Sequence, residues 1–319
     1  AALGGTWAVP TLVATGSLDS ARVEGLAAPG LRLRATYADR LLDLDLQGLA
    51  VDTAATRDAF RLTAALPLDL TLSSRTLAQR KLDEDVFIRF VADGTSLSGF
   101  EALVPQVREL QGGFDADLLV SGRWGALEPR GSFLLRDGAF AVPALRTGFR
   151  DVLADVALTP DSVIVHRLRL SDERAPGDSA SLEGALFRRG TRWNADFRTF
   201  ARNLRVIDDP NLAEADASWL LSLRGPVDSL LLGGEITLPN ANAFIGRQRA
   251  ILDVEPAATS TSSANTYMPR IDQLTIRLGN EVRLRSPEAN VQLTGDIAVT
   301  GTLQDPSVRG EILATRGTY

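Results

Sequence analysis

The chain has 319 residues, of which 45% are hydrophobic and 23% charged, and its formal net charge is -6. This balance excludes an intrinsically disordered chain, and the lack of a basic patch with interleaved aromatic residues argues against nucleic-acid binding. The sequence contains no cysteine, which fits an oxidising compartment, and no apolar run of about eighteen residues that would predict a membrane-spanning helix. The opening residues do not resemble a signal peptide, and we expect the chain to be part of a longer protein.

Alternation of apolar and polar residues dominates the sequence. In the segment "LLDLDLQ", for example, Leu42 and Leu44 point to one side while Asp43 and Asp45 point to the other. Such alternation is typical of antiparallel strands that have one buried and one wet face, and it predicts about twenty strands joined mostly by short turns. The clearest segments, in chain order, are 31–37, 41–47, 67–73, 114–120, 151–159, 179–186, 272–286 and 289–301.

Three stretches interrupt this pattern. "SGFEALVPQVREL" predicts one short helix, in which Ser98 caps the start, Glu101 follows three residues later, and Leu103, Val107 and Leu110 share a face. Within 272–286, the Gly-Asn pair predicts a turn between two strands. Residues 255–270 are rich in Ser, Thr, Ala and Pro without periodicity, and they predict a mobile loop.

A spacing of two glycines recurs along the chain, and each copy lies between alternating runs. The first glycine predicts a turn with positive φ, and the second predicts a return to extended structure. Four copies indicate a repeated supersecondary unit with irregular spacing. The pairs are Gly16 with Gly25, Gly122 with Gly131, Gly225 with Gly234, and Gly301 with Gly310.

The predicted fold class is all-β, with one long curved antiparallel sheet. A flat sheet of this size is improbable because sheets twist and curl, so the apolar face must be covered by folding over. Two forms are open: a closed sandwich with a filled core, or a half-open trough. Aromatic residues are only 6% of the chain, and the predicted inward positions are almost entirely aliphatic.

An aliphatic face without polar anchors suits generic acyl chains, because burying each methylene contributes about 0.8 kcal/mol. The alternative is that these residues only pack against one another. The inward positions of the clearest strands are the candidate lipid-binding residues, namely Leu42, Leu44, Leu118, Val120, Val156, Leu158, Leu182, Leu274, Ile276, Leu278, Val282, Leu284, Val291, Leu293, Ile297 and Val299.

Catalytic and metal sites find little support in the sequence. His166 is the only histidine, and its strand-like context "VIVHRLRL" favours a structural role. The acidic groups at 172–178 and 208–210 are expected to be solvated loop residues, since they lack calcium-loop spacing. No phosphate-binding glycine loop and no G-x-S-x-G motif occurs. We therefore expect neither an enzyme nor a cofactor or metal.

Several motifs resemble the C-terminal domain of the TamB family, the translocation and assembly module proteins of diderm bacteria. They are the short predicted helix before "GGFDADLLVSG", the "P-x-G-x-x-x-L-x-D-G" stretch ending at Asp137 and Gly138, and "L-x-D-V" at 153–156. "GNEVRLRSPEANVQLTGDIAVTGTLQDPSVRGEILATRGTY" is similar to the stretch near the family's C-terminus. The resemblance covers about residues 93–190 and 271–319, and it consists of fold-setting residues rather than catalytic ones.

The resemblance implies a U-shaped β-groove, or β-taco, with one short helix and with residues 1–319 forming a single elongated body. Members of the family are anchored in the inner membrane, cross the periplasm and pair with a TamA-like outer-membrane barrel that carries POTRA domains. They are similar to AsmA-like and bridge-type lipid-transfer proteins. We expect the anchor helix and the segment that engages the outer-membrane partner to belong to the full-length protein, outside this chain, which ends at "RGTY".

Together with the aliphatic inward positions, the resemblance implies a periplasmic groove that conducts phospholipid passively between the two membranes and supports outer-membrane biogenesis. The alternative is a scaffold for outer-membrane β-barrel assembly, whose edge strands add onto nascent strands by β-augmentation. A third alternative, a β-solenoid adhesin with a filled core, would leave no room for a ligand.

Overall fold

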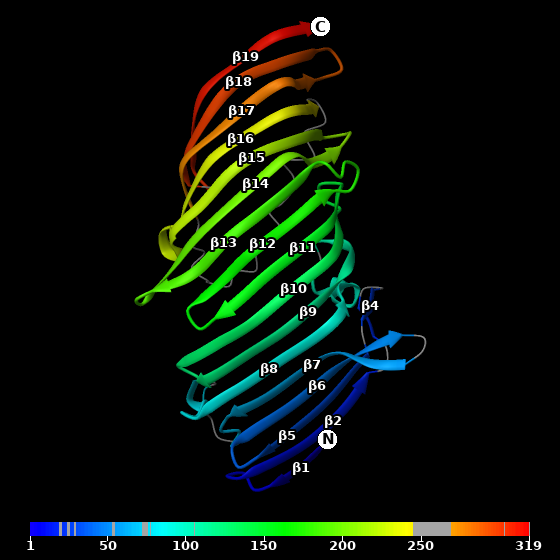
Figure 1. Cartoon of the computed structure of the whole chain (residues 1–319), viewed down its shortest axis with the longest axis vertical. Coiled ribbons are helices and arrows are strands. Elements are labelled where there is room, and N and C mark those ends of the chain that lie inside the picture. Colours follow the sequence, from blue (N-terminus) through cyan, green and yellow to red (C-terminus); the bar gives the residue numbers. More distant parts are fainter. Residues whose placement is uncertain are drawn as a thin grey trace. The chain divides into compact units, whose positions relative to one another are not determined.

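The computed structural model describes residues 1–18, 21–23, 26–28, 30–52, 55–71, 76, 78–104, 106–244, 269–302 and 304–318. Within these residues, seventeen strands belong to one sheet, and β3 (Ala21–Val23) and β4 (Leu26–Ala28) form a separate ribbon. Figure 1 shows long curved strands lying side by side in chain order, β5 to β9 in one part of the chain and β13 to β19 in another. The prediction of an all-β fold built on a long curved sheet is confirmed. None of the described helices is long and apolar enough to cross a membrane.

The described residues divide into two compact units. Unit 1 contains residues 1–139 and 153–163, and unit 2 contains residues 140–152 and 164–319. Three strands contribute residues to both units: β10 (Ala126–Val142), β11 (Thr147–Thr159) and β12 (Ser162–Asp172). The expectation that residues 1–319 form a single elongated groove stays a prediction.

Unit 1 is an antiparallel ladder in which β1 pairs with β2, β2 pairs with β5, and the strands from β5 to β9 each pair with the next strand in the chain. Between β5 and β6, Asp39 and Arg40 have φ values of 49° and 64°. Two central residues with positive φ are the signature of a tight hairpin turn whose twist matches the strands. The strands are β1 (Ala2–Gly5), β2 (Pro10–Leu18), β5 (Gly30–Ala38), β6 (Leu41–Asp52), β7 (Ala55–Pro67), β8 (Asp85–Ser96) and β9 (Arg108–Arg123), with a 3₁₀ turn η1 (Ala78–Arg80) between β7 and β8.

The predicted short helix is a 3₁₀ helix, η2 (Leu97–Leu103), rather than an α-helix extending to Leu110. Ser96, not Ser98, caps it, because the Ser96 side chain accepts a hydrogen bond from the backbone N–H of Ser98 at 3.3 Å. Leu110 instead lies in β9, where its N–H donates to Oε2 of Glu101 at 3.2 Å. The return into a long strand therefore limits the helix to about two turns.

Unit 2 is also antiparallel, with one exception at β16 and β17. The strands are β13 (Ser179–Arg189), β14 (Arg192–Asp209), β15 (Ala213–Pro226), β16 (Leu231–Phe244), β17 (Arg270–Arg285), β18 (Asn290–Thr302) and β19 (Pro306–Thr318), with a 3₁₀ turn η3 (Val227–Ser229) after β15. β16 and β17 run parallel, so the chain must cross back between them. Of the predicted mobile loop 255–270, only Pro269 and Arg270 are within the described residues.

The turn predicted at Gly279 and Asn280 does not form, because β17 continues through both residues as one strand. The interruption is a bulge instead, which shifts the register with β18 between Leu278 and Val282. A Cβ atom at Gly279 would lie 2.8 Å from the Cα atom of Pro239 on β16. The glycine thus marks a close approach of two backbones rather than a reversal of the chain.

The glycine repeat is confirmed for three of its four copies. Gly301 has φ 103° where β18 ends, and Gly310 has φ 154° inside β19. A side chain at Gly310 would collide with the carbonyl oxygen of Asp296 on the facing strand. The other two pairs behave alike: φ is 101° at Gly122 and 110° at Gly225, the first glycines, and 141° at Gly131 and 137° at Gly234, the second ones. In the remaining pair Gly16 has no positive φ, and Gly25 lies outside the described residues.

Candidate functional site

In unit 2, the predicted apolar face is continuous across seven strands. Residues that face each other in neighbouring strands point to the same side of a sheet, so the register defines rows of side chains. The central row is, in spatial order, Leu182, Thr199, Leu221, Gly234, Leu274, Val299 and Val308. The next row is Ala180, Ala201, Trp219, Ile236, Ile276, Ile297 and Gly310. Both rows are almost entirely apolar.

The same face continues towards the far ends of the strands. Leu278 faces Gly295, and beyond the bulge Val282 faces Leu293 and Leu284 faces Val291. All ten candidate residues of unit 2 therefore share one side of the sheet, as the alternation predicts. They are Leu182, Leu274, Ile276, Leu278, Val282, Leu284, Val291, Leu293, Ile297 and Val299.

The packing of this face comes from within the sheet itself. Ile271, Leu274 and Val299 are buried, and the partly buried residues packed against them come from strands β15 to β18 as well. On the edge strand, Val308 is 60% exposed and Ile312 is 50% exposed. The described residues of this cluster thus form a single aliphatic layer, not two layers packed on each other.

In unit 1, the apolar face has the same construction. Leu44 stands in a row with Ala35, Ala64, Ile88 and Val120, each on its own strand. The adjacent rows contain Leu42, which faces Tyr37, and Leu118, which faces Phe90. Leu42, Leu44, Leu118 and Val120 therefore lie on one side of the sheet.

Part of this face in unit 1 is covered by five phenylalanines. Phe100 of η2 lies between two rings of the sheet, with its centroid 5.7 Å from those of Phe60 and Phe114. Phe90 and Phe133 extend the group, at 5.7 Å from Phe60 and 5.5 Å from Phe114. We call these five residues the phenylalanine cluster. The sequence analysis missed it, although each ring of the sheet occupies an inward position of its strand.

Two further candidates, Val156 and Leu158, lie in β11 and are half-buried. Their place relative to the rows of unit 1 stays a prediction, as does lipid binding by all sixteen candidates.

The polar face carries ion pairs between neighbouring strands. Arg277 on β17 contacts Glu235 on β16 at 2.6 Å and Asp296 on β18 at 3.2 Å. Arg89 and Asp117 form a similar pair between β8 and β9 at 3.0 Å. All five side chains are about half-exposed, so each pair adds little stability. The two faces of the sheet are therefore chemically distinct.

The expectation that the acids at 172–178 and 208–210 are all solvated is wrong for Asp172 and Asp208. Asp172 is 4% exposed and accepts hydrogen bonds from the backbone N–H groups of Arg174, Ala175 and Arg205. The side chain of Asp208 is 13% exposed and is paired with Arg174 and Arg205. These carboxylates fix the loop after β12 to β14, which is a structural role.

No cluster of three metal-ligating side chains occurs among the residues that the structure describes. His166 is exposed on β12, where Glu183 and Arg198 line the same shallow depression. The residues that line this depression include no Ser, Thr or Cys that His166 could activate as a nucleophile.

The comparison with protein families gives one match, to the TamB C-terminal domain over residues 168–319. Residues 168–319 are a TamB C-terminal domain. The match confirms the resemblance to the TamB family for these residues, and it spans every strand that carries the apolar face of unit 2. Residues 93–167, where the resemblance was also noted, lie outside the match. Neither the curated proteins nor the solved structures gave a match.

The match to the TamB C-terminal domain supports a role related to that of TamB in outer-membrane assembly or lipid transport. The family is an envelope-associated transport and assembly module rather than a family of enzymes, and its members work with TamA-type partners.

Proposed function

We propose that the apolar face of this TamB domain holds the acyl chains of phospholipids and lets them slide between the inner and outer membranes. The observation that carries the proposal is the continuity of the aliphatic rows across β13 to β19. Each methylene that leaves water for this face contributes about 0.8 kcal/mol. Because the central rows contain almost no hydrogen-bonding side chain, no position holds a lipid tightly.

The dimensions of the face suit this role. Seven strands at a spacing of about 4.8 Å extend over about 29 Å. The hydrocarbon core of a bilayer is about 30 Å thick and holds two acyl chains end to end, so one chain is about half as long as a row. An acyl chain lying along a row would therefore cross several strands, and its head group would remain in water.

The cellular setting of the proposal follows from the family. The domain would act in the periplasm as part of an inner-membrane-anchored protein, beside a TamA-like outer-membrane barrel with POTRA domains. Phospholipid would move passively along the groove, and this transfer would support outer-membrane biogenesis.

The test compares two arginine substitutions on the same strand. Ile276→Arg places a charge on the apolar face, whereas Thr275→Arg places the same charge on the opposite face, where Thr275 faces Ala298. Co-purifying phospholipid, measured by native mass spectrometry, is expected to fall about tenfold or more in Ile276→Arg and to stay unchanged in Thr275→Arg. Circular dichroism checks that both variants fold. Normal lipid content and normal uptake of labelled phospholipid by folded Ile276→Arg would refute the proposal.

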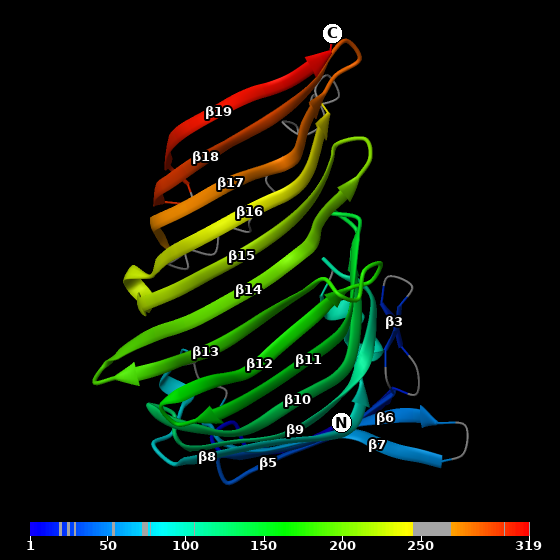
Figure 2. The same cartoon turned by 45° about the horizontal axis from the view of Figure 1, so that its top comes forward.

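One observation supports the scaffold alternative. β19 is the last strand of unit 2 in Figures 1 and 2, and all its described residues are exposed. An exposed edge can pair with a strand of another protein. Leu313 lies on this edge, faces Thr294 and is 51% exposed, but it is not on the apolar face. Leu313→Lys should weaken binding of an unfolded outer-membrane β-barrel protein if the scaffold operates, and should leave lipid content unchanged.

A further inference from the structure

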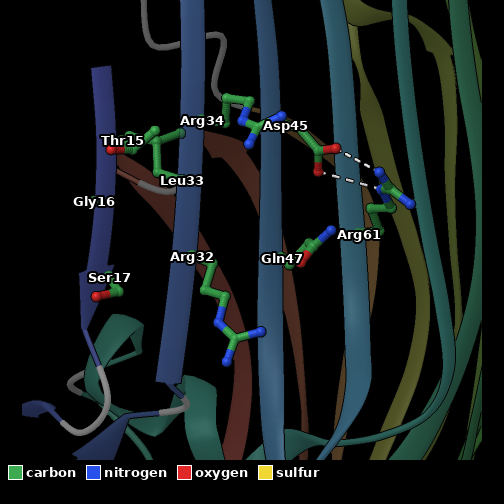
Figure 3. A pocket seen from close by; sticks show the side chains of 9 residues that line it. All are labelled: Thr15, Gly16, Ser17, Arg32, Leu33, Arg34, Asp45, Gln47 and Arg61. Carbon is green, nitrogen blue, oxygen red and sulfur yellow. Dashed lines mark hydrogen bonds and ion pairs between the residues drawn. The ribbon is translucent and has the colours of Figure 1, made fainter. Parts of the chain in front are cut away.

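The polar face of unit 1 contains a shallow depression lined by three arginines. Figure 3 shows the side chains of β2, β5, β6 and β7 that surround it. Its volume is about 500 Å³. The lining residues are Thr15, Gly16, Ser17, Arg32, Leu33, Arg34, Asp45, Gln47 and Arg61.

The register of the strands brings the polar groups together in two adjacent rows. Arg32 faces Ser17 on one side and Gln47 on the other, and Gln47 faces Arg61. In the next row, Arg34 stands between Thr15 and Asp45. Because Arg32 and Arg34 are two residues apart on β5, their side chains leave the sheet on the same side.

The arginines in this depression are only partly neutralised. Nε of Arg61 donates to Oδ1 of Asp45 at 3.2 Å, and a second contact makes the pair bidentate. Arg32 and Arg34 are exposed and have no ion pair within the described part of the chain. Three arginines face one aspartate among the lining residues, a net charge of +2 (3 − 1). The next carboxylate, Asp43, lies one row further along, where it faces Thr36.

This charge balance differs from that around several other arginines of the polar face. At Arg89, Arg224 and Arg277 the neighbouring strand supplies a carboxylate within 3.3 Å. At Arg32, the neighbouring strands supply the hydroxyl of Ser17 and the amide of Gln47. Those groups can donate hydrogen bonds to an anion, and an acid could not.

We infer that this depression is a binding site for a phosphate group. Guanidinium groups recognise phosphate through paired, charge-assisted hydrogen bonds, and the fork of Arg suits this geometry better than the ammonium of Lys. Arg32 and Arg34 would contact the anion directly, while Ser17 and Gln47 would complete the donor set. The phosphate could belong to inorganic phosphate or to the head group of an anionic phospholipid. The inference does not depend on the proposed role of the apolar face.

The experiment measures phosphate binding by the whole chain and by matched variants. Isothermal titration with inorganic phosphate tests the free anion, and flotation with vesicles of phosphatidylcholine, with and without phosphatidylglycerol, tests the head group. Arg32→Gln with Arg34→Gln is the test variant, and Arg89→Gln is the control, because Arg89 lies on the same face but is paired with Asp117. Arg32→Lys keeps the charge and removes the fork, so it separates specific recognition from general attraction.

Binding of either probe should weaken by about tenfold for each arginine removed, and should be unchanged in Arg89→Gln. Binding of inorganic phosphate identifies the free anion as a sufficient ligand, whereas binding only to vesicles with phosphatidylglycerol identifies the lipid head group. The inference is overturned if neither probe binds, or if Arg89→Gln weakens binding as much as the double variant does. All substituted side chains are exposed, and circular dichroism confirms that the variants are folded.

Discussion

The apolar faces of the two units are built from the same alternation but differ in what covers them. In unit 1, η2 lays Phe100 on the sheet, and the phenylalanine cluster fills the space above the strands. In strands β15 to β18 of unit 2, the corresponding cluster consists of Ile, Leu and Val from the sheet alone. Alternation therefore selects the apolar face, whereas the volume of the side chains and a covering segment decide whether that face becomes a closed core.

This difference bears on the choice between a closed core and an open groove. A filled core needs interdigitating side chains from two sides at close packing. The phenylalanine cluster meets this requirement locally in unit 1. Among the described residues, the aliphatic cluster of β15 to β18 is packed only by side chains of the sheet itself, and the proposed function is based on this.

The largest expected effect is on stability. Phe60 is 8% exposed within the phenylalanine cluster, so Phe60→Ala should destabilise unit 1 by about 3–5 kcal/mol. Ile276→Ala, in the uncovered layer, should cost unit 2 only about 1–2 kcal/mol because fewer contacts are lost. Hydrogen exchange measures the two units separately. Equal losses in both units would remove the distinction between a covered and an uncovered face.

A smaller effect is expected from the glycines. Gly234 has φ 137°, and an added Cβ would collide with the carbonyl oxygen of Leu220, so Gly234→Ala should destabilise unit 2 by about 1–3 kcal/mol. Gly16→Ala should change the stability of unit 1 by less than about 0.5 kcal/mol, because the added Cβ meets nothing within 4 Å. Urea unfolding measures the free energy of unfolding of both variants. Comparable losses would contradict the distinction between Gly234, which needs to be glycine, and Gly16, which does not.

Removing the cover in unit 1 should make its face more like that of unit 2. Phe100→Ala should cost about 1–2 kcal/mol, since the ring is half-buried, and should increase binding of a fluorescent acyl probe. Leu127→Ala, at an exposed position of β10, serves as the control. If Phe100→Ala loses stability but binds no additional probe, Phe100 only contributes to core packing and does not block access to the apolar face.

The smallest effect is expected on the polar face. Asp296→Ala removes one half-exposed partner of Arg277, while Glu235 remains. The loss should be below about 1 kcal/mol and should shrink further at high salt. Urea unfolding at low and high salt tests this. A loss as large as that of Ile276→Ala would mean that the polar face, rather than the apolar layer, stabilises unit 2.

Much of the fold could be predicted because alternation is a local signal. The period of two placed Ile276, Leu278 and Ile297 on one side of the sheet without any knowledge of their partners. The parallel pairing of β16 with β17 depends on how the chain returns between them, and the alternation of residues within a strand carries no information about that connection. Likewise, Asp172 could not be recognised as buried, since its hydrogen-bond donors include the N–H of Arg205, thirty-three residues away.

The candidate site could be predicted only as a set of positions. The alternation of apolar and polar residues identified Leu118 and Val120 as inward positions. The covering of the neighbouring surface by Phe100 depends instead on the path of η2. Along that path Glu101 accepts a hydrogen bond from the N–H of Leu110 in β9, although the sequence assigned both residues to one helix.

The most direct test of the central claim is photo-cross-linking with a labelled phospholipid. A photoreactive residue replaces Ile276 in one variant and Thr275 in another, so that the two probes differ only in the face from which they project. The account predicts a lipid adduct from position 276 and none from position 275. Adducts of equal yield from both positions, or an adduct from position 275 alone, would contradict it.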